Sequence, residues 1–285
     1  MGDLTTIQLR DGRTLGYREY GDPGGSSVLN CHGGLLCGLD VAPFDDPARE
    51  LGLRIISPDR PGLLRSSSAP GRATGDWPDD VRQLLAALDV ERCGVLGWSM
   101  GGQYALACAA GLPDLVSRTT VIAGCLPLDG PGTFDELNDM DRRFTRLAQH
   151  HPHVATEMFR ALGELARRTP HAWTQLTTRG AVPDEGSAVD SLPEPGIAAA
   201  AAEALRHGEG MTEEYVAWAR PWGFTPEDVR SEVDVWQGDQ DDLVPPAWGA
   251  ELARRLPNGR LRSVEGAGHF LGYTHTSEVL SAFVG

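Results

Sequence analysis

The sequence contains no lysine, so its 25 basic residues are all arginine, and 40 acidic residues give a formal net charge of −15. A surface that binds nucleic acid needs basic side chains to neutralise phosphates. The charge balance therefore argues against a general nucleic-acid partner. It does not point to a cationic substrate, because net charge mainly affects solubility and long-range steering.

Long hydrophobic runs are also missing. No stretch of 18 apolar residues occurs, so no membrane-spanning helix is predicted. Residues 1–9 have neither the basic nor the apolar segment of a signal peptide. The five cysteines are an odd number without a C-x-x-C pair, which predicts neither a disulfide framework nor a zinc knuckle. We therefore expect a cytoplasmic protein that does not contact membranes.

Signatures of metals and nucleotides are absent as well. The one dense group of histidines, His150, His151 and His153, has no acidic partner at helical spacing and predicts a solvated helix end. The glycines at 24–25 and 33–34 do not match a nucleotide-binding pattern. We predict no metal and no cofactor. The expected partner is a small-molecule substrate, and no pattern specifies an oligomeric state.

What the sequence does contain is an alternation of strands and helices. Residues 5–9 and 14–20 alternate around Asp11-Gly12, which predicts a β-hairpin. Apolar strands are predicted at 27–31, 54–57, 92–98, 118–122, 233–236 and 260–264. Helices are predicted at 77–88, with Asp76 as N-cap, and at 100–110, 247–256 and 271–283. Continuous apolar strands alternating with helices indicate a mostly parallel, doubly wound sheet covered on both faces.

Residues 127–225 interrupt this alternation with helical patterns and turn signals. Candidate helices are 134–149, 153–168 and 197–206. The sequence predicts one α/β core formed by residues 1–126 and 226–285, with a helical insertion between them. Most aromatic and long apolar residues of the insertion are expected to pack within it, and some to line a pocket. They are Phe144, Met158, Phe159, Trp173, Met211, Tyr215, Trp218, Trp222 and Phe224.

Gly97-Trp98-Ser99-Met100-Gly101 matches G-x-S-x-G between a predicted strand and a predicted helix of small residues. A serine on a sharp strand-to-helix turn has strained backbone angles, and bulky neighbours would clash there. The turn would expose the Ser99 hydroxyl above the sheet edge. The backbone N–H of Met100 would then point to the place where a tetrahedral oxyanion forms. We predict that Ser99 is a nucleophile.

A serine hydroxyl needs a base. His269 falls in a loop after the last predicted strand, which is where a doubly wound sheet places functional groups. His275 is expected to be an exposed residue of the following helix. The base in turn needs a carboxylate, and Asp239, Asp241 and Asp242 all follow strand 233–236. Asp239 is expected to bond its own backbone and Asp242 to cap a turn, so Asp241 is the predicted acid.

The chain order Ser99, Asp241, His269 is the nucleophile–acid–base order of α/β-hydrolases. The sequence resembles that superfamily over nearly all of its length outside the insertion. The resemblance is to the cap-bearing branch, which includes proline iminopeptidase-like enzymes, esterases and carbon–carbon bond hydrolases. Some members carry the acid after the sixth strand, which here would place it near Asp129 or Asp135.

His32-Gly33-Gly34 resembles the H-G-G oxyanion loop of this superfamily. The likeness implies that the N–H of Gly34 or Leu35 is the second oxyanion donor, and that His32 braces the loop. The sequence departs from the usual Pro-Gly continuation, since Leu35-Leu36 follows. The family's D-R-P-G-x-G-x-S segment is only partly kept at residues 59–66, and we expect it to be structural.

The resemblance implies a serine hydrolase that cleaves a small, mainly apolar ester, thioester or amide through an acyl-enzyme. Its pocket is expected to include Leu35, Trp98, Met100 and Phe270. A carbon–carbon bond hydrolase or lyase would use the same triad, and a non-enzymatic receptor for a small ligand could retain it.

An aminopeptidase of the proline iminopeptidase type is another alternative. It would need an acidic group in the insertion to hold the substrate amine. The candidates, each expected to be an exposed helix residue, are Glu203, Glu209, Glu213 and Glu214.

Overall fold

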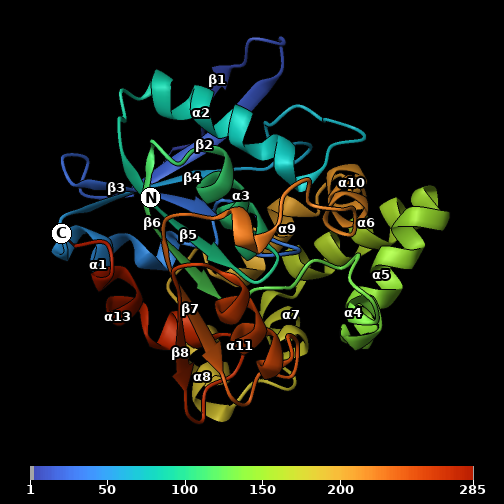
Figure 1. Ribbon diagram of the computed structural model, residues 1–285. Coiled ribbons are helices and arrows are strands. Elements are labelled where there is room, and N and C mark those ends of the chain that lie inside the picture. Colours follow the sequence, from blue (N-terminus) through green and yellow to red (C-terminus); the bar gives the residue numbers. More distant parts are fainter. Residues whose placement is uncertain (1–2, 285) are drawn as a thin grey trace.

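The computed structural model describes residues 3–284, which form one central sheet with helices on both sides (Figure 1). The sheet has eight strands in the order β1-β2-β4-β3-β5-β6-β7-β8. Strands β3 to β8 run parallel, and β1 and β2 pair antiparallel at one edge. The strands are β1 Thr5–Gln8, β2 Thr14–Gly21, β3 Ser26–Cys31, β4 Leu53–Pro58, β5 Cys93–Trp98, β6 Val116–Ile122, β7 Glu232–Gly238 and β8 Gly259–Val264. The predicted hairpin and mostly parallel sheet are confirmed.

The central strands read as continuous apolar runs because both of their faces are buried. One face packs against α1 (Asp45–Glu50) and α13 (Thr276–Ser281), and contributes Val28, Ile55, Leu96 and Ile122 to one core cluster. The opposite face packs against α2 (Trp77–Ala87), α3 (Gly101–Gly111) and α11 (Pro246–Arg255). It contributes Leu29, Ile56, Val95 and Val121 to a second, larger cluster.

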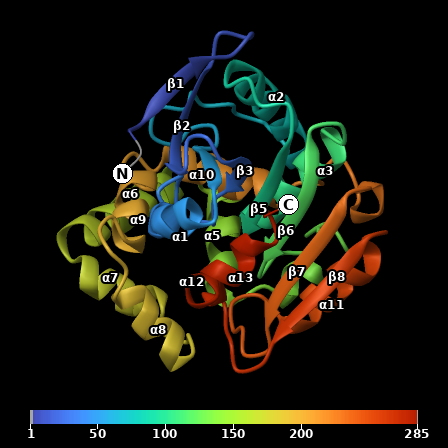
Figure 2. The same ribbon diagram turned by 90° about the vertical axis from the view of Figure 1, so that its left-hand side faces the viewer.

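Between β6 and β7 the described chain is helical and contains no strand. The helices are α4 Thr133–Glu136, α5 Asp139–His150, α6 Pro152–Arg168, α7 Pro170–Thr177, α8 Pro183–Asp190, α9 Ile197–Ala204 and α10 Glu209–Trp218. These helices lie together beside the sheet (Figure 2). One of them, α8, packs against α12 (Leu271–Thr274), which follows β8.

Several predicted helix boundaries are wrong. The predicted helix 134–149 is two helices, since Asn138 caps α5 by accepting the N–H of Asp141. The predicted helix 271–283 is also divided, and His275 lies at the junction instead of within a helix. Asp76 is the N-cap residue of α2 as predicted, but its carboxylate makes no capping bond to α2 and accepts the N–H of Ala73 instead. Sequence reasoning also missed α1, α7, α8 and α10.

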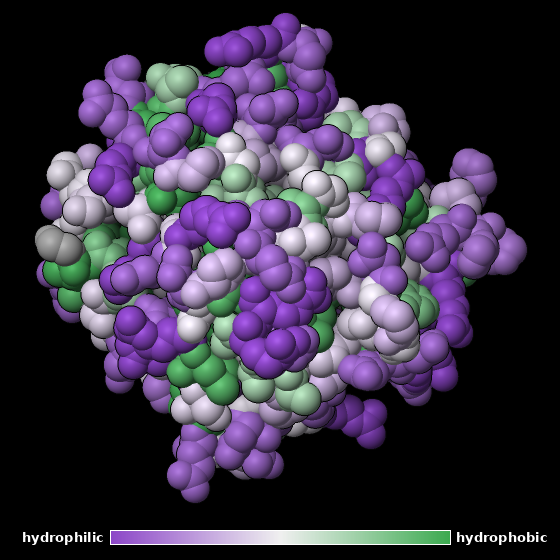
Figure 3. All heavy atoms as spheres, viewed as in Figure 1, coloured by the Kyte–Doolittle hydropathy of each residue, from purple (hydrophilic) through white to green (hydrophobic). Residues whose placement is uncertain are grey.

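The outer surface agrees with the charge balance of the sequence. The face in Figure 3 is mainly hydrophilic, and its apolar side chains form small patches. Within residues 3–284, no helix combines the length and apolar character required to cross a bilayer.

Candidate active site

Ser99 lies on the turn between β5 and α3, with a φ of +54°. This left-handed conformation is costly for a residue with a side chain. The flanking glycines are required by close contacts. A Cβ at Gly97 would lie 2.6 Å from the carbonyl oxygen of Gly101, and one at Gly101 would lie 1.9 Å from the carbonyl oxygen of Cys31. The G-x-S-x-G pattern thus follows from the packing of α3 against β5 and β3.

Met100 is the N-cap residue of α3, and backbone N–H groups at a helix N-terminus favour negative charge. The loop after β3 approaches it directly, since a Cβ at Gly34 would lie 3.2 Å from the Met100 side chain. Leu35, the next residue, has a φ of +59°. The residues predicted as oxyanion donors, Met100, Gly34 and Leu35, therefore line one cavity together with Ser99.

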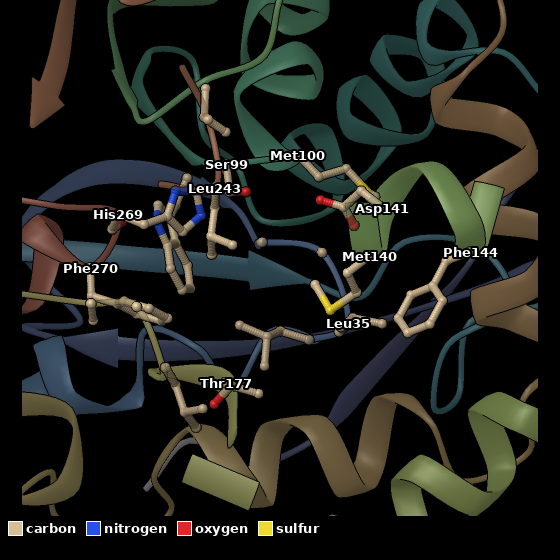
Figure 4. A pocket seen from close by; sticks show the side chains of 18 of the residues that line it. Leu35, Ser99, Met100, Met140, Asp141, Phe144, Thr177, Leu243, His269 and Phe270 are labelled. Carbon is tan, nitrogen blue, oxygen red and sulfur yellow. The ribbon is translucent and has the colours of Figure 1, made fainter. Parts of the chain in front are cut away.

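His269 follows β8 and its side chain contacts Asp241, which follows β7. Nδ1 of His269 lies 3.0 Å from Oδ2 and 3.2 Å from Oδ1 of Asp241. Both residues are 5% exposed. His269 and Ser99 line the same cavity, on which they converge from separate loops (Figure 4).

The Asp241 carboxylate is held by donors from its own loop and strand. The backbone N–H groups of Leu243 and Val244 each donate to Oδ1 at 2.9 Å, and the Gln237 amide donates to Oδ2 at 3.1 Å. Burial would raise the pKa of Asp241, but the interactions with His269 and these N–H groups lower it. Asp241 therefore stays ionised beside the imidazole.

The imidazole of His269 is surrounded by carboxylates. Burial alone would lower its pKa, but the charge and hydrogen bond of Asp241, with further contributions from Asp141 and Glu185, raise it above the ordinary 6.5. The raised pKa makes His269 a stronger proton acceptor.

Glu185 of α8 reaches the histidine loop from the insertion. Its Oε1 accepts the N–H of Gly268 at 2.6 Å and its Oε2 accepts the N–H of Phe270 at 2.9 Å, so the two bonds flank His269. Glu185 is 1% exposed. Sequence reasoning missed this residue, and no local pattern marks it, because Gly268 lies 83 positions away.

Trp98 supports the histidine loop from β5. Its indole N–H donates to the carbonyl oxygen of His269 at 2.9 Å. Its ring centroid lies 5.6 Å from those of both His269 and Phe270. All four residues predicted for the pocket, Leu35, Trp98, Met100 and Phe270, lie on the wall of the same cavity.

His32 braces the loop and is not placed as a base. Its Nδ1 contacts the carbonyl oxygen of Gly33 at 3.0 Å, and its Nε2 accepts the N–H of Arg60 at 3.3 Å. Burial and the Arg60 charge lower the pKa of His32 to about 3. His32 is therefore neutral at ordinary pH and engaged at both nitrogens.

The prediction that Glu214 is an exposed helix residue is wrong. Glu214 is fully buried, and its carboxylate pairs with Arg60 at 2.6 Å and with Arg72 at 2.6 Å. This pairing joins α10 to the core segment at 59–66 that was expected to be structural. Glu209 is exposed as predicted, whereas Glu203 and Glu213 are half-buried. All three also lie outside the cavity wall, so none of the four candidate amine-binding glutamates reaches it.

The other aspartates considered as acids have different surroundings, although one of them, Asp242, also lines the cavity. Asp239 does not bond its own backbone as predicted; it accepts the N–H of Gly266 at 2.8 Å. Asp242 is exposed, and its carboxylate lies against Gly180 instead of capping a turn. Asp129 and Asp135 are exposed and do not line the cavity.

The cavity above Ser99 encloses about 300 Å³, a size that suits a small molecule. The core supplies the ends of the strands and the insertion supplies the opposite wall. Of the insertion's aromatic residues named above, Phe144, Trp173, Tyr215 and Trp218 line it. Most of the wall is apolar. Over residues 3–284, the side chains form no histidine, cysteine or carboxylate cluster suited to a metal ion.

Residues 27–276 match the family described as the alpha/beta hydrolase fold, and the chain belongs to this family. The eight-stranded, mostly parallel sheet is that fold. An esterase from Exiguobacterium antarcticum superposes with a TM-score of 0.73 at 18% identity, covering 100% of this chain and 98% of that one. A likeness at that identity concerns the fold.

Curated relatives add hydrolase names. The 3-hydroxybutyrate-oligomer hydrolase of Cupriavidus necator is 26% identical over 277 residues, which cover 94% of this chain and 91% of the relative. The proline iminopeptidase of Xanthomonas citri is 32% identical over 124 residues, 42% of this chain and 38% of that one. The family and these relatives support an alpha/beta hydrolase enzyme.

Proposed function

We propose that this protein is a serine hydrolase that cleaves a small, mainly apolar carboxylic ester through a covalent acyl-enzyme. Ser99 is the nucleophile, His269 the general base and acid, and Asp241 the group that orients His269. Helices α4–α10 act as the cap that closes the substrate cavity. The observation that carries this proposal is the convergence of Ser99, on its strained turn, and the His269–Asp241 pair at one apolar cavity.

In acylation, Nε2 of His269 takes the hydroxyl proton as the Ser99 oxygen attacks the ester carbonyl. The carbonyl oxygen becomes an oxyanion, which the N–H of Met100 and that of Gly34 or Leu35 stabilise. The imidazolium then gives its proton to the departing alcohol as the carbon–oxygen bond breaks. The acyl group stays on Ser99.

In deacylation, water attacks the acyl-enzyme and His269 takes its proton. Collapse of the second oxyanion returns that proton to the Ser99 oxygen and releases the carboxylic acid. Asp241 remains a carboxylate throughout and stabilises the imidazolium. The name of the Cupriavidus necator relative, which covers most of the chain, supports an ester as the cleaved bond.

A screen of p-nitrophenyl esters, thioesters and aminoacyl anilides on the wild type and on Ser99→Ala tests the proposal. We expect ester turnover by the wild type and a loss on the order of a million-fold in kcat for the variant. A fluorophosphonate should label Ser99 in the wild type alone. Turnover that persists in Ser99→Ala would reject the nucleophile, and labelling with at most slow turnover would favour a receptor.

A further inference from the structure

Asp141 brings a carboxylate into the apolar cavity from the first turn of α5. The other carboxylate and the arginine of the cavity wall, Asp242 and Arg179, are exposed. In Figure 4, the Asp141 carboxylate points toward the side of the cavity where Ser99 and Met100 lie. A carboxylate in such a place requires hydrogen-bond donors, because leaving it unpaired is costly.

The protein supplies Asp141 with two side-chain donors. The Tyr215 hydroxyl donates to Oδ1 at 2.8 Å and the Asn138 amide donates to Oδ2 at 2.8 Å. A carboxylate can accept about four hydrogen bonds, so acceptor capacity remains for a ligand. Burial raises the pKa of Asp141, while these donors and His269 oppose the rise. The group is thus a hydrogen-bond acceptor that residues of the insertion hold in place on the wall of the cavity.

The position of Asp141 indicates which part of a bound ester, the acyl chain or the alcohol, would contact it. His269 must give its proton to the leaving alcohol, so the alcohol lies on the histidine side of Ser99. In the view of Figure 4, Ser99 lies between His269 and Asp141. A group that contacts Asp141 therefore belongs to the acyl chain.

The surroundings of Asp141 distinguish a hydroxyl from an ammonium group. An ammonium carries three N–H donors, whereas a hydroxyl carries one. Figure 4 shows Met100, Met140 and Phe144 around the carboxylate, and these side chains offer no strong acceptor. A hydroxyl can be satisfied by Asp141 alone, but an ammonium would leave donors unpaired in an apolar cavity.

We propose that the cavity selects esters whose acyl chain carries a hydroxyl group, and that Asp141 accepts the hydrogen bond of that hydroxyl. This inference rests on the proposed serine hydrolysis and names its substrate class. Asp141 is then the residue that determines acyl specificity, while Ser99, His269 and Asp241 perform the chemistry.

The test compares kcat/KM for p-nitrophenyl butyrate and for its 2-hydroxy, 3-hydroxy and 3-amino derivatives. We expect the wild type to prefer one of the hydroxy esters over butyrate by about 10- to 100-fold, the range of a hydrogen bond to a charged group. Asp141→Asn should reduce this ratio to about threefold or less. Asp139→Asn is the matched control, because Asp139 begins the same helix but is exposed and paired with Arg142, and its ratio should equal that of the wild type.

Each remaining outcome decides against the proposal. If the wild type hydrolyses the hydroxy esters and butyrate with similar kcat/KM, the proposal is wrong. This result needs only the wild type, so it holds even if Asp141→Asn folds poorly. A wild-type ratio that Asp141→Asn leaves intact would reject Asp141 as the acceptor. If the 3-amino ester were the best substrate, Asp141 would bind an ammonium group, and the proposed hydroxyl would be rejected. Turnover of none of the four esters, nor of any ester in the wider screen, would reject the proposed function and this inference with it.

Discussion

His269 and Asp241 are joined through Nδ1, which lies 3.0 Å from the Asp241 carboxylate. Because Nδ1 is committed to this acid, Nε2 is the nitrogen that can accept the serine proton. In the proposed mechanism, this pair sets both the tautomer and the orientation of His269.

Asp241→Asn is expected to lower kcat by about four orders of magnitude, because an amide in this place favours the wrong tautomer. Asp239→Asn, Asp242→Asn, Asp129→Asn and Asp135→Asn should each cost less than about tenfold. Steady-state kinetics on an ester substrate measures all five. Near-normal activity in Asp241→Asn with collapse in another variant would reassign the acid, although the roles of Ser99 and His269 would survive.

Activity should rise with pH along a limb governed by His269, because only the neutral imidazole accepts the serine proton. Its pKa is raised by the neighbouring carboxylates, so the midpoint of the limb in kcat/KM should lie above 6.5. A pH–rate profile between pH 5 and 9 measures it. With chemistry rate-limiting, a flat profile would contradict a histidine base.

Glu185→Gln should shift that limb to lower pH and reduce kcat by about tenfold. The glutamine amide can accept only one of the two N–H groups around His269, and the variant loses one negative charge near the imidazole. Glu157→Gln, on the exposed surface of α6, is the control and should leave the profile unchanged. A lower kcat with an unmoved limb would mean that Glu185 acts on the loop's position without affecting the imidazole's charge balance.

Glu214→Gln should destabilise the protein by about 3 kcal/mol, because it leaves the buried Arg60 and Arg72 without a compensating charge. Burial would raise the pKa of Glu214, but the charges of the two arginines lower it to about 2, from 4.5. The carboxylate therefore stabilises the fold above pH 4.5, and this contribution is lost as the pH falls toward 2. Urea unfolding of the variant and of Glu209→Gln, an exposed control, should show a difference that shrinks in acid.

Sequence reasoning could predict those parts of the candidate site that depend on a pattern within a short segment. The turn at Ser99 is specified within five residues by the glycines that α3 requires, and the apolar strands mark the sheet edge where His269 and Asp241 emerge. Residues that act across the chain left no such pattern. Glu185 meets Gly268 over 83 positions and Glu214 meets Arg60 over 154, so the first was missed and the second was predicted on the surface.

Helix predictions failed for related reasons. α7 and α8 are eight residues long and each begins with a proline, which suits the first turn of a helix but reads as a turn signal in the sequence alone. Their stability comes from packing against neighbouring elements, because isolated helices of this length are marginal.

The reach of Glu185 to the peptide groups around His269 limits how the insertion can be exchanged. A chimaera that replaces residues 127–225 with the corresponding segment of a relative would change the cavity wall and remove the two bonds that hold the base loop. The chimaera would then have the relative's cavity wall but a less firmly held His269 loop, unless the new segment places a carboxylate where Glu185 lies. Under the proposed function, a single stretch of chain therefore supplies both the residues that select the substrate and the residue that positions the loop of His269.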